Sequence, residues 1–247
     1  MNLMRWIDQR KHWWKVFLII FAVSVAVVGY IGAKTYEYAP PMCDFVDPAG
    51  NLVFSAEDIV AGQKLFFRYG LMDYGSFLGD GGMRGPDFTA EALHQTALAM
   101  NRSYEERWKD RFADEATRRS LVEAMVQREL KQNRYDPDYY RKKGNVRETK
   151  YAPGAVVLTE AQAEAFRHVV AYYGEKFGSG GERVGRETFR PAHYITDPAE
   201  IRSLSAFFFW GGWLSAAERP GYPYSYTHNW PYDPLAGNTP HGGLVLW

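Results

Sequence analysis

Cysteine is almost absent from this chain. Cys43 is the only one, so an internal disulfide, a zinc site built on paired cysteines and a CxxCH haem-attachment motif are all excluded. An excess of one charge is lacking too, since Lys and Arg number 29 and Asp and Glu number 29. A neutral chain gives no electrostatic argument for nucleic-acid binding. The basic, Tyr-containing stretch 133–158 could suggest a single-strand binder, but the neutral total and the membrane topology inferred below argue against that interpretation.

Motifs for phosphate, metal and haem are missing as well. The Gly-rich segment 70–86 contains neither GxxxxGK[ST] nor GxGxxG, so it predicts a tight irregular loop and not a phosphate cradle. His94 has no second ligand at i+4 of its predicted helix, and we expect it at the surface or in a hydrogen bond; we expect His168 to face solvent. No nucleophile–base pair is present, so the sequence assigns no catalytic, cofactor-binding or metal-ligating residue. The six histidines show no spacing typical of haem ligation or of a three-His iron site. They are His12, His94, His168, His193, His228 and His241.

What the chain does have is an uncharged apolar segment from Val16 to Ala33. As a helix rising about 1.5 Å per residue it would span roughly 27 Å, close to the thickness of the hydrocarbon core. Residues 1–15 before it carry four basic side chains against one acidic, which predicts a cytoplasmic N-terminus and an extracytoplasmic remainder. A cleaved signal peptide and a buried soluble helix are the rival interpretations. The length of the run favours a basic arm and membrane anchor over residues 1–38.

Capping signals predict a mainly α-helical domain after this anchor. Ser55 with Asp58 at N3 opens a helix that ends near Tyr69, and Thr159 with Gln162 forms a capping box for another. Asp197 begins the last predicted helix, which extends to Ala217 and carries an apolar cluster that must be buried; Pro220 is expected to stop it. The other predicted elements are a hairpin-like turn over 46–54, a helix over 87–101, a charged helical stretch over 102–133 and a short strand over 155–158.

A Pro- and Tyr-rich stretch follows the last predicted helix and extends to Asn238. It has no helical or alternating period, which predicts an extended, ordered strap. Because large aromatic side chains are unfavourable in water, we expect it to lie against the domain, a membrane surface or a partner. Its aromatic residues are Tyr222, Tyr224, Tyr226, Trp230 and Tyr232.

Two long blocks carry a resemblance to a known family. They are DIVAGQKLFFRYGLMDYGSFLGDGGMRGPDFTAEALH, residues 58–94, and LSAFFFWGGWLSAAERPGYPYSYTHNWPYDPLAGNTP, residues 204–240. Together with the apolar N-terminal segment and their order, these blocks resemble the N-terminal region of the quinol-dependent nitric-oxide reductases, single-chain members of the haem–copper oxidase superfamily. Asp80 is a departure, because the family more usually has a histidine there, and no role of that histidine is carried over.

The resemblance implies a mainly α fold that begins with a transmembrane helix. Residues 39–240 would form an extracytoplasmic, cytochrome c-like helical domain with long irregular loops, and this domain would bind no haem. Such a fold needs an N-terminal helix crossing a C-terminal one, and the predicted helices at 55–69 and 197–217 could supply that pair. An empty apolar cavity is destabilising, so side chains must fill the vacated haem pocket. The candidate fillers are Phe67, Tyr69, Met72, Tyr74, Phe77 and Phe208.

In that family the segment after residue 240 leads into a helical bundle whose histidines hold haem b and non-haem iron. Residues 241–247 are predicted as the start of this second transmembrane helix, at which the sequence stops. The implied reaction is the reduction of two NO to N2O and water with two protons and two electrons from quinol, carried out in the bundle. This chain would hold no cofactor itself. Its implied partners are the bilayer, the catalytic bundle on the same or a separate chain, and quinol through that bundle, at a bacterial inner membrane with the main domain periplasmic.

We expect the strap segment 222–235 at the boundary between domain and membrane. The polar and aromatic candidates there are Arg219, His228, Trp230 and Asp233, and a role in holding the backbone of the strap is favoured over a redox or proton role. The alternative function is a non-catalytic, membrane-tethered assembly or docking subunit for a separate redox partner. The apolar end GGLVLW favours a fragment, or a subunit whose partner continues the bundle.

Overall fold

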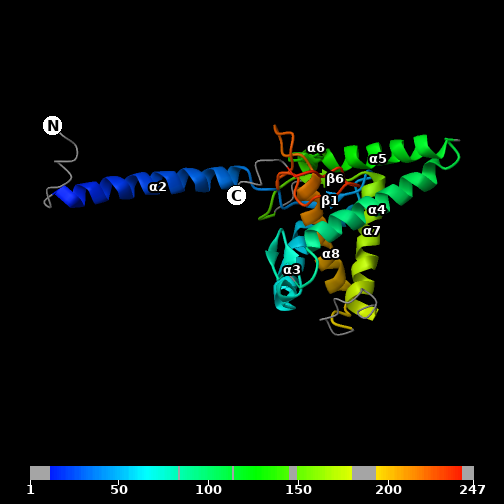
Figure 1. The fold of residues 1–247 in the computed structure, drawn as a ribbon, viewed down its shortest axis with the longest axis horizontal. Coiled ribbons are helices and arrows are strands. Elements are labelled where there is room, and N and C mark those ends of the chain that lie inside the picture. Colours follow the sequence, from blue (N-terminus) through cyan, green and yellow to red (C-terminus); the bar gives the residue numbers. More distant parts are fainter. Residues whose placement is uncertain (1–11, 83, 113, 145–148, 180–192, 241–247) are drawn as a thin grey trace. The chain divides into compact units, whose positions relative to one another are not determined.

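The computed structural model describes residues 12–82, 84–112, 114–144, 149–179 and 193–240 (Figure 1). The chain divides into two compact units, Met1–Pro40 and Pro41–Trp247. Most of the expected basic arm lies outside the described residues. The expected start of a second transmembrane helix, residues 241–247, lies entirely outside them. The predicted mainly α class, with an apolar N-terminal helix and a helical domain with loops, is confirmed.

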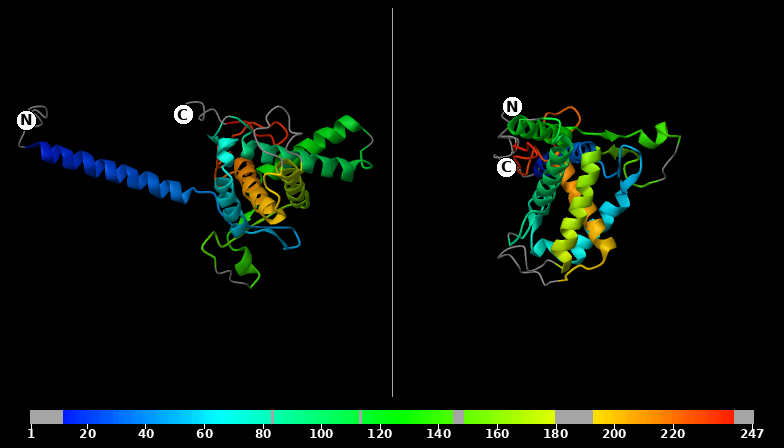
Figure 2. Two further views of the ribbon diagram at one scale, coloured as in Figure 1. Left: turned by 90° about the horizontal axis from the view of Figure 1, so that it is seen from below. Right: turned by 90° about the vertical axis from the view of Figure 1, so that its right-hand side faces the viewer.

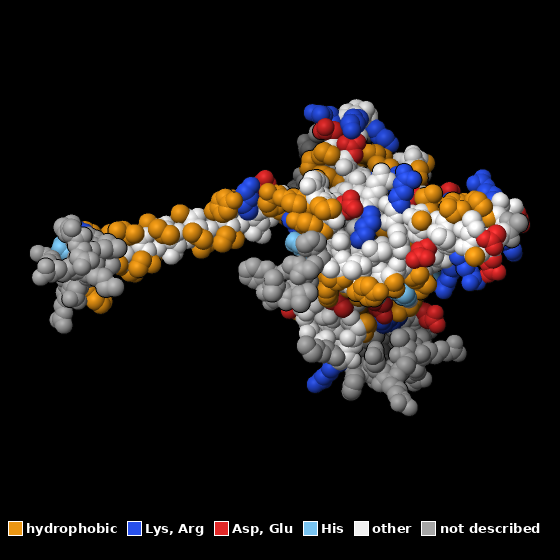
Figure 3. Space-filling view, turned by 45° about the horizontal axis from the view of Figure 1, so that its top comes forward, with side chains coloured by type: hydrophobic (Ala, Val, Ile, Leu, Met, Phe, Trp, Pro, Cys, Tyr) orange, Lys and Arg blue, Asp and Glu red, His pale blue; other side chains and the backbone are white. Residues whose placement is uncertain are grey.

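The first unit contains helix α2, Trp13–Glu37. It is the one helix among the described residues that is long and apolar enough to cross a membrane, and none of its side chains is buried. Hydrophobic side chains cover its surface along its length (Figure 3). An exposed apolar helix of this length needs a lipid or protein environment, because water would solvate it poorly.

A small sheet begins the second unit. Strands β1 (Asp44–Val46) and β2 (Leu52–Phe54) form the antiparallel hairpin that the turn at 46–54 predicted. β1 also pairs in parallel with β6 (Ala155–Val157), which pairs with β5 (Tyr135–Asp136), giving the order β2-β1-β6-β5. A separate two-stranded sheet, β3 (Ser76–Phe77) with β4 (Asp80–Gly81), lies within the predicted irregular Gly-rich loop.

Helices α3 (Ala56–Arg68) and α8 (Pro198–Ala216) form the close pair at the centre of the helical domain. The predicted Ser55–Asp58 capping box begins α3, and Asp197 accepts a hydrogen bond from the amide of Ala199 to begin α8. The helices touch at Gly62, where a Cβ atom would lie 2.7 Å from Cβ of Phe207 and overlap the carbonyl oxygen of Ser203. This is the pairing of an early and a late helix that the sequence predicted.

Three further helices complete the domain: α4 (Phe88–Trp108), α5 (Glu115–Lys131) and α7 (Glu160–Gly174). Figure 2 shows α4, α7 and α8 side by side, consistent with their mutual packing. The predicted capping box of Thr159 and Gln162 opens α7, which continues into a π-helical turn, Glu175–Ser179. The short elements are a 3-10 turn, Leu71–Asp73, and α6, Tyr139–Lys142.

Three details differ from the sequence predictions. The charged stretch is two helices and not one: residues 102–108 extend α4, and Asp114 caps a new helix by accepting a hydrogen bond from the amide of Thr117 at 2.9 Å. α8 ends at Ala216, one residue before the predicted end at Ala217. His168 is half-buried, with Nε2 placed 3.1 Å from Oε1 of Gln95, so the expectation that it faces solvent was wrong.

The Gly62→Ala variant should lower the free energy of unfolding by about 1–3 kcal/mol, because the added methyl group has to separate α3 from α8. The matched control is Gly174→Ala, where the nearest atom to the new Cβ is Cγ2 of Ile201 at 3.9 Å. That change should be neutral or stabilising by up to about 1 kcal/mol through helix propensity. Urea unfolding of the full chain in detergent, followed by circular dichroism, measures both; equal effects at the two glycines would contradict the close crossing.

Candidate functional site

Aromatic rings fill the space between α3, α4, α7 and α8. Phe208 lies at the centre with no exposed surface. Its ring stacks on Phe88 at 4.8 Å and 6°, and it contacts Tyr173 at 4.9 Å and Phe66 at 6.0 Å. Phe66, Phe77, Phe88, Tyr173, Phe207 and Phe208 are called the aromatic core below. Because rings of one helix lie between rings of the next, the aromatic core couples all four helices.

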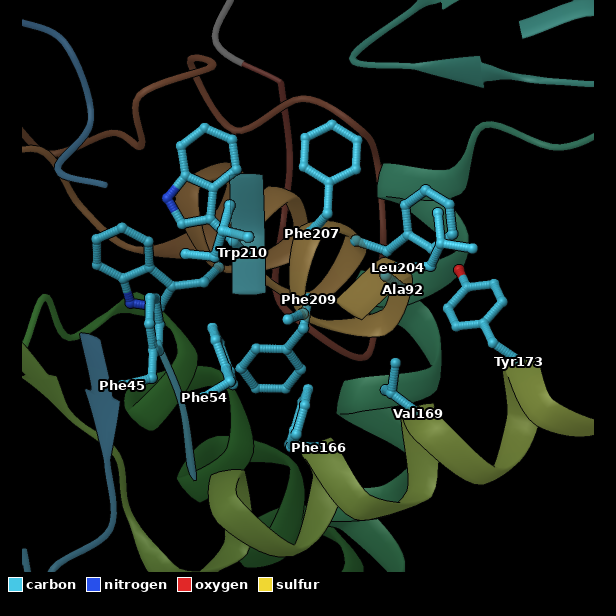
Figure 4. Close-up of a cluster of buried hydrophobic side chains, with 14 of the residues drawn as sticks. Phe45, Phe54, Ala92, Phe166, Val169, Tyr173, Leu204, Phe207, Phe209 and Trp210 are labelled. Atoms are coloured by element: carbon cyan, nitrogen blue, oxygen red, sulfur yellow. The ribbon is translucent and has the colours of Figure 1, made fainter. Parts of the chain in front are cut away.

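A second group of rings continues this packing toward the sheet (Figure 4). Phe54 of β2 contacts Phe45 of β1 at 4.4 Å and Phe166 of α7 at 4.7 Å. Phe209 of α8 lies 5.7 Å from Phe54 and 5.5 Å from Phe166. The sheet is therefore bound to the helices through rings, and one hydrophobic cluster runs from β1 to α7.

The six predicted pocket fillers have different environments. Phe208 is buried, and Phe77 is half-buried with its ring stacked 4.1 Å from Phe207. Met72, Tyr69 and Tyr74 pack at the edge of the cluster, where the two tyrosine rings contact Tyr194. Phe67 is 58% exposed, so its prediction as a filler was wrong.

The neighbouring Phe66 takes the buried position instead of Phe67, and its ring contacts Phe77, Phe88, Phe207 and Phe208. Successive residues on a helix point about 100° apart, so only one of two adjacent phenylalanines can face α8. The apolar spacing of Ile59 and Phe66, seven residues apart, was the sequence signal for this orientation.

The residues packed between these helices are mostly aromatic and aliphatic. The segment after α3, residues 69–74, contains no cysteine or histidine. Cys43 is buried, and that burial raises the pKa of its thiol to about 12, so the thiol stays protonated at neutral pH. Among the described residues no group of three or more His, Cys, Asp or Glu side chains could hold a metal ion.

A buried ion pair joins α4 to the π-helical turn after α7. Nζ of Lys176 bonds Oε1 of Glu91, which also accepts a hydrogen bond from the hydroxyl of Tyr172 at 2.7 Å. The ammonium group lies 5.7 Å from the ring of Phe88, so the pair borders the aromatic core. The sequence did not predict this pair, because two polar residues 85 positions apart give no local signal for it.

Residues 217–240, called the strap below, lie across the C-terminal end of α8. The amide of Tyr226 donates to the carbonyl oxygen of Leu214 at 3.2 Å, and the ring of Tyr226 lies 6.0 Å from Trp213. Asn238 is fully buried and donates to the carbonyl oxygens of Ser215 (3.0 Å) and Pro231 (2.9 Å). The strap is therefore ordered and bound to the domain along its inner side.

His94 of α4 and Lys131 of α5 also hold the strap on its inner side. Nζ of Lys131 donates to Oδ1 of Asn238 at 2.6 Å, and burial lowers the pKa of Lys131. Nδ1 of His94 lies 2.8 Å from Oδ2 of Asp233, while Oδ1 of Asp233 accepts from the amide of Ala236 at 2.9 Å. The expectation that His94 lies at the surface or in a hydrogen bond is confirmed.

Three of the four boundary candidates, Arg219, His228 and Trp230, are half-buried within the strap. Nη2 of Arg219 donates to the carbonyl oxygen of Tyr226 at 3.3 Å, and the ring of His228 stacks on Tyr224 at 4.5 Å. Trp230 is half-buried against Gly79, the glycine between β3 and β4. Asp233, the fourth, was expected at the boundary but is only 5% exposed, because it pairs inward with His94. Asp80 is exposed in β4.

Comparison with known families decides what this architecture is. A family model for the cytochrome c-like domain of the nitric oxide reductase protein NorB matches residues 43–232. The chain belongs to this NorB cytochrome c-like family. No curated protein matches the chain. The NorB domain thus includes the sheet, the aromatic core and most of the strap, and the apolar helix α2 precedes it.

Phe208→Ala should lower the free energy of unfolding of the NorB domain by about 3–5 kcal/mol, since it leaves a cavity among rings from α3, α4 and α7. The control is Phe67→Ala on the exposed face of α3, which should change the free energy by no more than about 0.5 kcal/mol. Denaturant titrations followed by tryptophan fluorescence give both values. A larger loss of stability from Phe67→Ala than from Phe208→Ala would contradict the finding that Phe67 is exposed and that Phe66 occupies the core position.

Asn238→Ala should release the strap of the NorB domain, because it removes two donors to carbonyl oxygens and the acceptor for the Lys131 ammonium. We expect a loss of about 1–3 kcal/mol and faster proteolysis within residues 217–240. Thr239→Ala changes an exposed neighbour and is the control. Limited proteolysis with mass mapping would show the difference, and identical cleavage of both variants would contradict the role of Asn238.

Proposed function

We propose that this chain is the N-terminal, membrane-anchored part of a quinol-dependent nitric-oxide reductase. The observation that carries the proposal is the NorB family match over residues 43–232 behind a helix suited to a membrane. The long motifs over 58–94 and 204–240 support the quinol-dependent subtype. The complete enzyme would reduce two NO to N2O and water, using two electrons from quinol and two protons.

In this proposal the chemistry takes place in a catalytic helical bundle, on the same or a separate chain, that holds haem b and non-haem iron. The helical domain of this chain covers the extracytoplasmic side of that bundle and binds no haem itself. The ring-filled space between α3 and α8 supports this, since rings occupy it and the segment after α3 has no cysteine or histidine. Its role would be structural: it closes the outer surface and positions the strap.

The proposed location is the inner membrane of a bacterium, with the N-terminus cytoplasmic and the helical domain periplasmic. The four basic side chains among residues 1–15 support this orientation, because positive residues stay on the cytoplasmic side. The absence of any disulfide is compatible with it, since the domain is held by an extensive hydrophobic cluster.

The test is to purify the chain alone, the catalytic bundle alone and the two together, and to measure NO consumption with reduced quinol. We expect turnover only when the bundle is present, and no Soret absorption from the chain alone. Turnover by the chain alone, or a Soret band that purifies with it, would overturn the assignment of the chemistry to the bundle. Full turnover by a bundle lacking this chain, with the chain raising only the yield of assembled enzyme, would instead establish the docking-subunit alternative.

A further inference from the structure

One part of the strap has an unusual surface. From Pro220 to Tyr232 the sequence contains no Asp, Glu, Lys or Arg, whereas α5 carries charged side chains along most of its length. Tyr222 is 37% exposed, and Pro220, Gly221 and Pro223 beside it are exposed as well. An exposed segment rich in Tyr and Pro and free of charge is unusual on a water-facing surface.

The exposed residues are held in a fixed turn. The amide of Arg219 donates to the carbonyl oxygen of Tyr224 at 2.9 Å, and the amide of Tyr222 donates to that of Arg219 at 3.0 Å. The ring of Tyr222 lies 5.2 Å from that of Tyr224, which in turn stacks on His228. The rings of Tyr222, Tyr224 and His228 thus contact one another in a row on a turn that two backbone hydrogen bonds close.

The connection to α2 limits which end of the domain can approach a bilayer. Three residues lie between Glu37, the end of α2, and Pro41, where the second unit begins, so the four Cα–Cα steps reach at most roughly 14 Å. A compact unit of about 200 residues has a radius of gyration of roughly 16 Å. The proposed anchoring therefore keeps the end that carries Pro41 within reach of the membrane surface.

That end is also the end with the strap. The carbonyl oxygen of Pro41 accepts a hydrogen bond from Nε1 of Trp210 at 3.1 Å, while the strap bonds Leu214 through Tyr226. Trp210 and Leu214 are one helical turn apart on α8, about 6 Å along its axis. The start of the domain and the strap thus share the C-terminal end of α8.

We propose that the turn 219–224, with the rings of Tyr224 and His228 behind it, rests in the lipid headgroup region of the bilayer that α2 crosses. This rests on the membrane anchoring in the proposed function and adds a second, reversible contact made by the domain itself. Tyrosine suits this depth because its ring enters the apolar boundary while its hydroxyl stays hydrated. Proline suits it too, because Pro220 and Pro223 have no amide hydrogen to be desolvated.

The experiment places an NBD fluorophore on the full chain through Tyr222→Cys. Native Cys43 is fully buried and stays unlabelled. The matched control is Leu121→Cys on α5, a site of similar exposure at 41% on a charged helix. Both proteins are reconstituted in vesicles of phosphatidylcholine and phosphatidylglycerol that contain headgroup-nitroxide lipid. We expect most of the fluorescence at 222 to be lost to the nitroxide and that at 121 to remain.

Equal quenching at both sites, or none at 222, would overturn the proposal. So would shielding of 222 from aqueous iodide without quenching by the nitroxide lipid, because that result means a protein surface covers the turn. The measurement involves no NO and no quinol. Its failure therefore leaves the reductase assignment standing, and a failure of the turnover test leaves the lipid contact standing.

Discussion

The crossing of α3 over α8 at Gly62 determines the spacing of the helical domain. Without a side chain at that position, the backbone of α3 reaches the carbonyl oxygen of Ser203 on α8. α8 makes two more close approaches, at Gly211 to the ring of Phe77 and at Gly212 to the backbone of Leu93 on α4. Large rings fill the volume on either side of these narrow contacts. The glycines let the helix backbones approach closely, and the large rings fill the space between the crossings. The close packing of the domain depends on both.

The features that could be predicted from the sequence are those that local chemistry determines. The capping boxes of Ser55 and Thr159 and the N-cap of Asp197 are found because their hydrogen bonds span only two or three residues. The hairpin at 46–54 was predictable for the same reason. The parallel pairing of β1 with β6 was not, because it joins residues about 110 positions apart and depends on how the helices between them pack. The end of α8 was predicted to within one residue.

The candidate site was predicted only in outline. That rings near residues 66–77 and 207–210 pack together follows from their hydrophobicity, but which ring faces inward depends on helix rotation. Assigning Phe67 in place of Phe66 is an error of one residue, about 100° around α3. Polar contacts were harder to predict from the sequence than ring packing. The pairs Glu91–Lys176 and His94–Asp233 join residues far apart in sequence, and each member looks like an ordinary surface residue in isolation.

These buried polar contacts explain why the strap has two different sides. Its inner side is held by hydrogen bonds. Asn238 donates to two carbonyl oxygens, Asp233 pairs with His94, and Lys131 donates to Asn238. Directional bonds fix an irregular segment more specifically than apolar contact does, because each buried group has few acceptable partners. With the inner side fixed in this way, the aromatic residues of the outer turn cannot rotate inward to escape water. A bilayer surface is less polar than bulk water, so the proposed headgroup contact would lower the cost of exposing the aromatic residues of this turn.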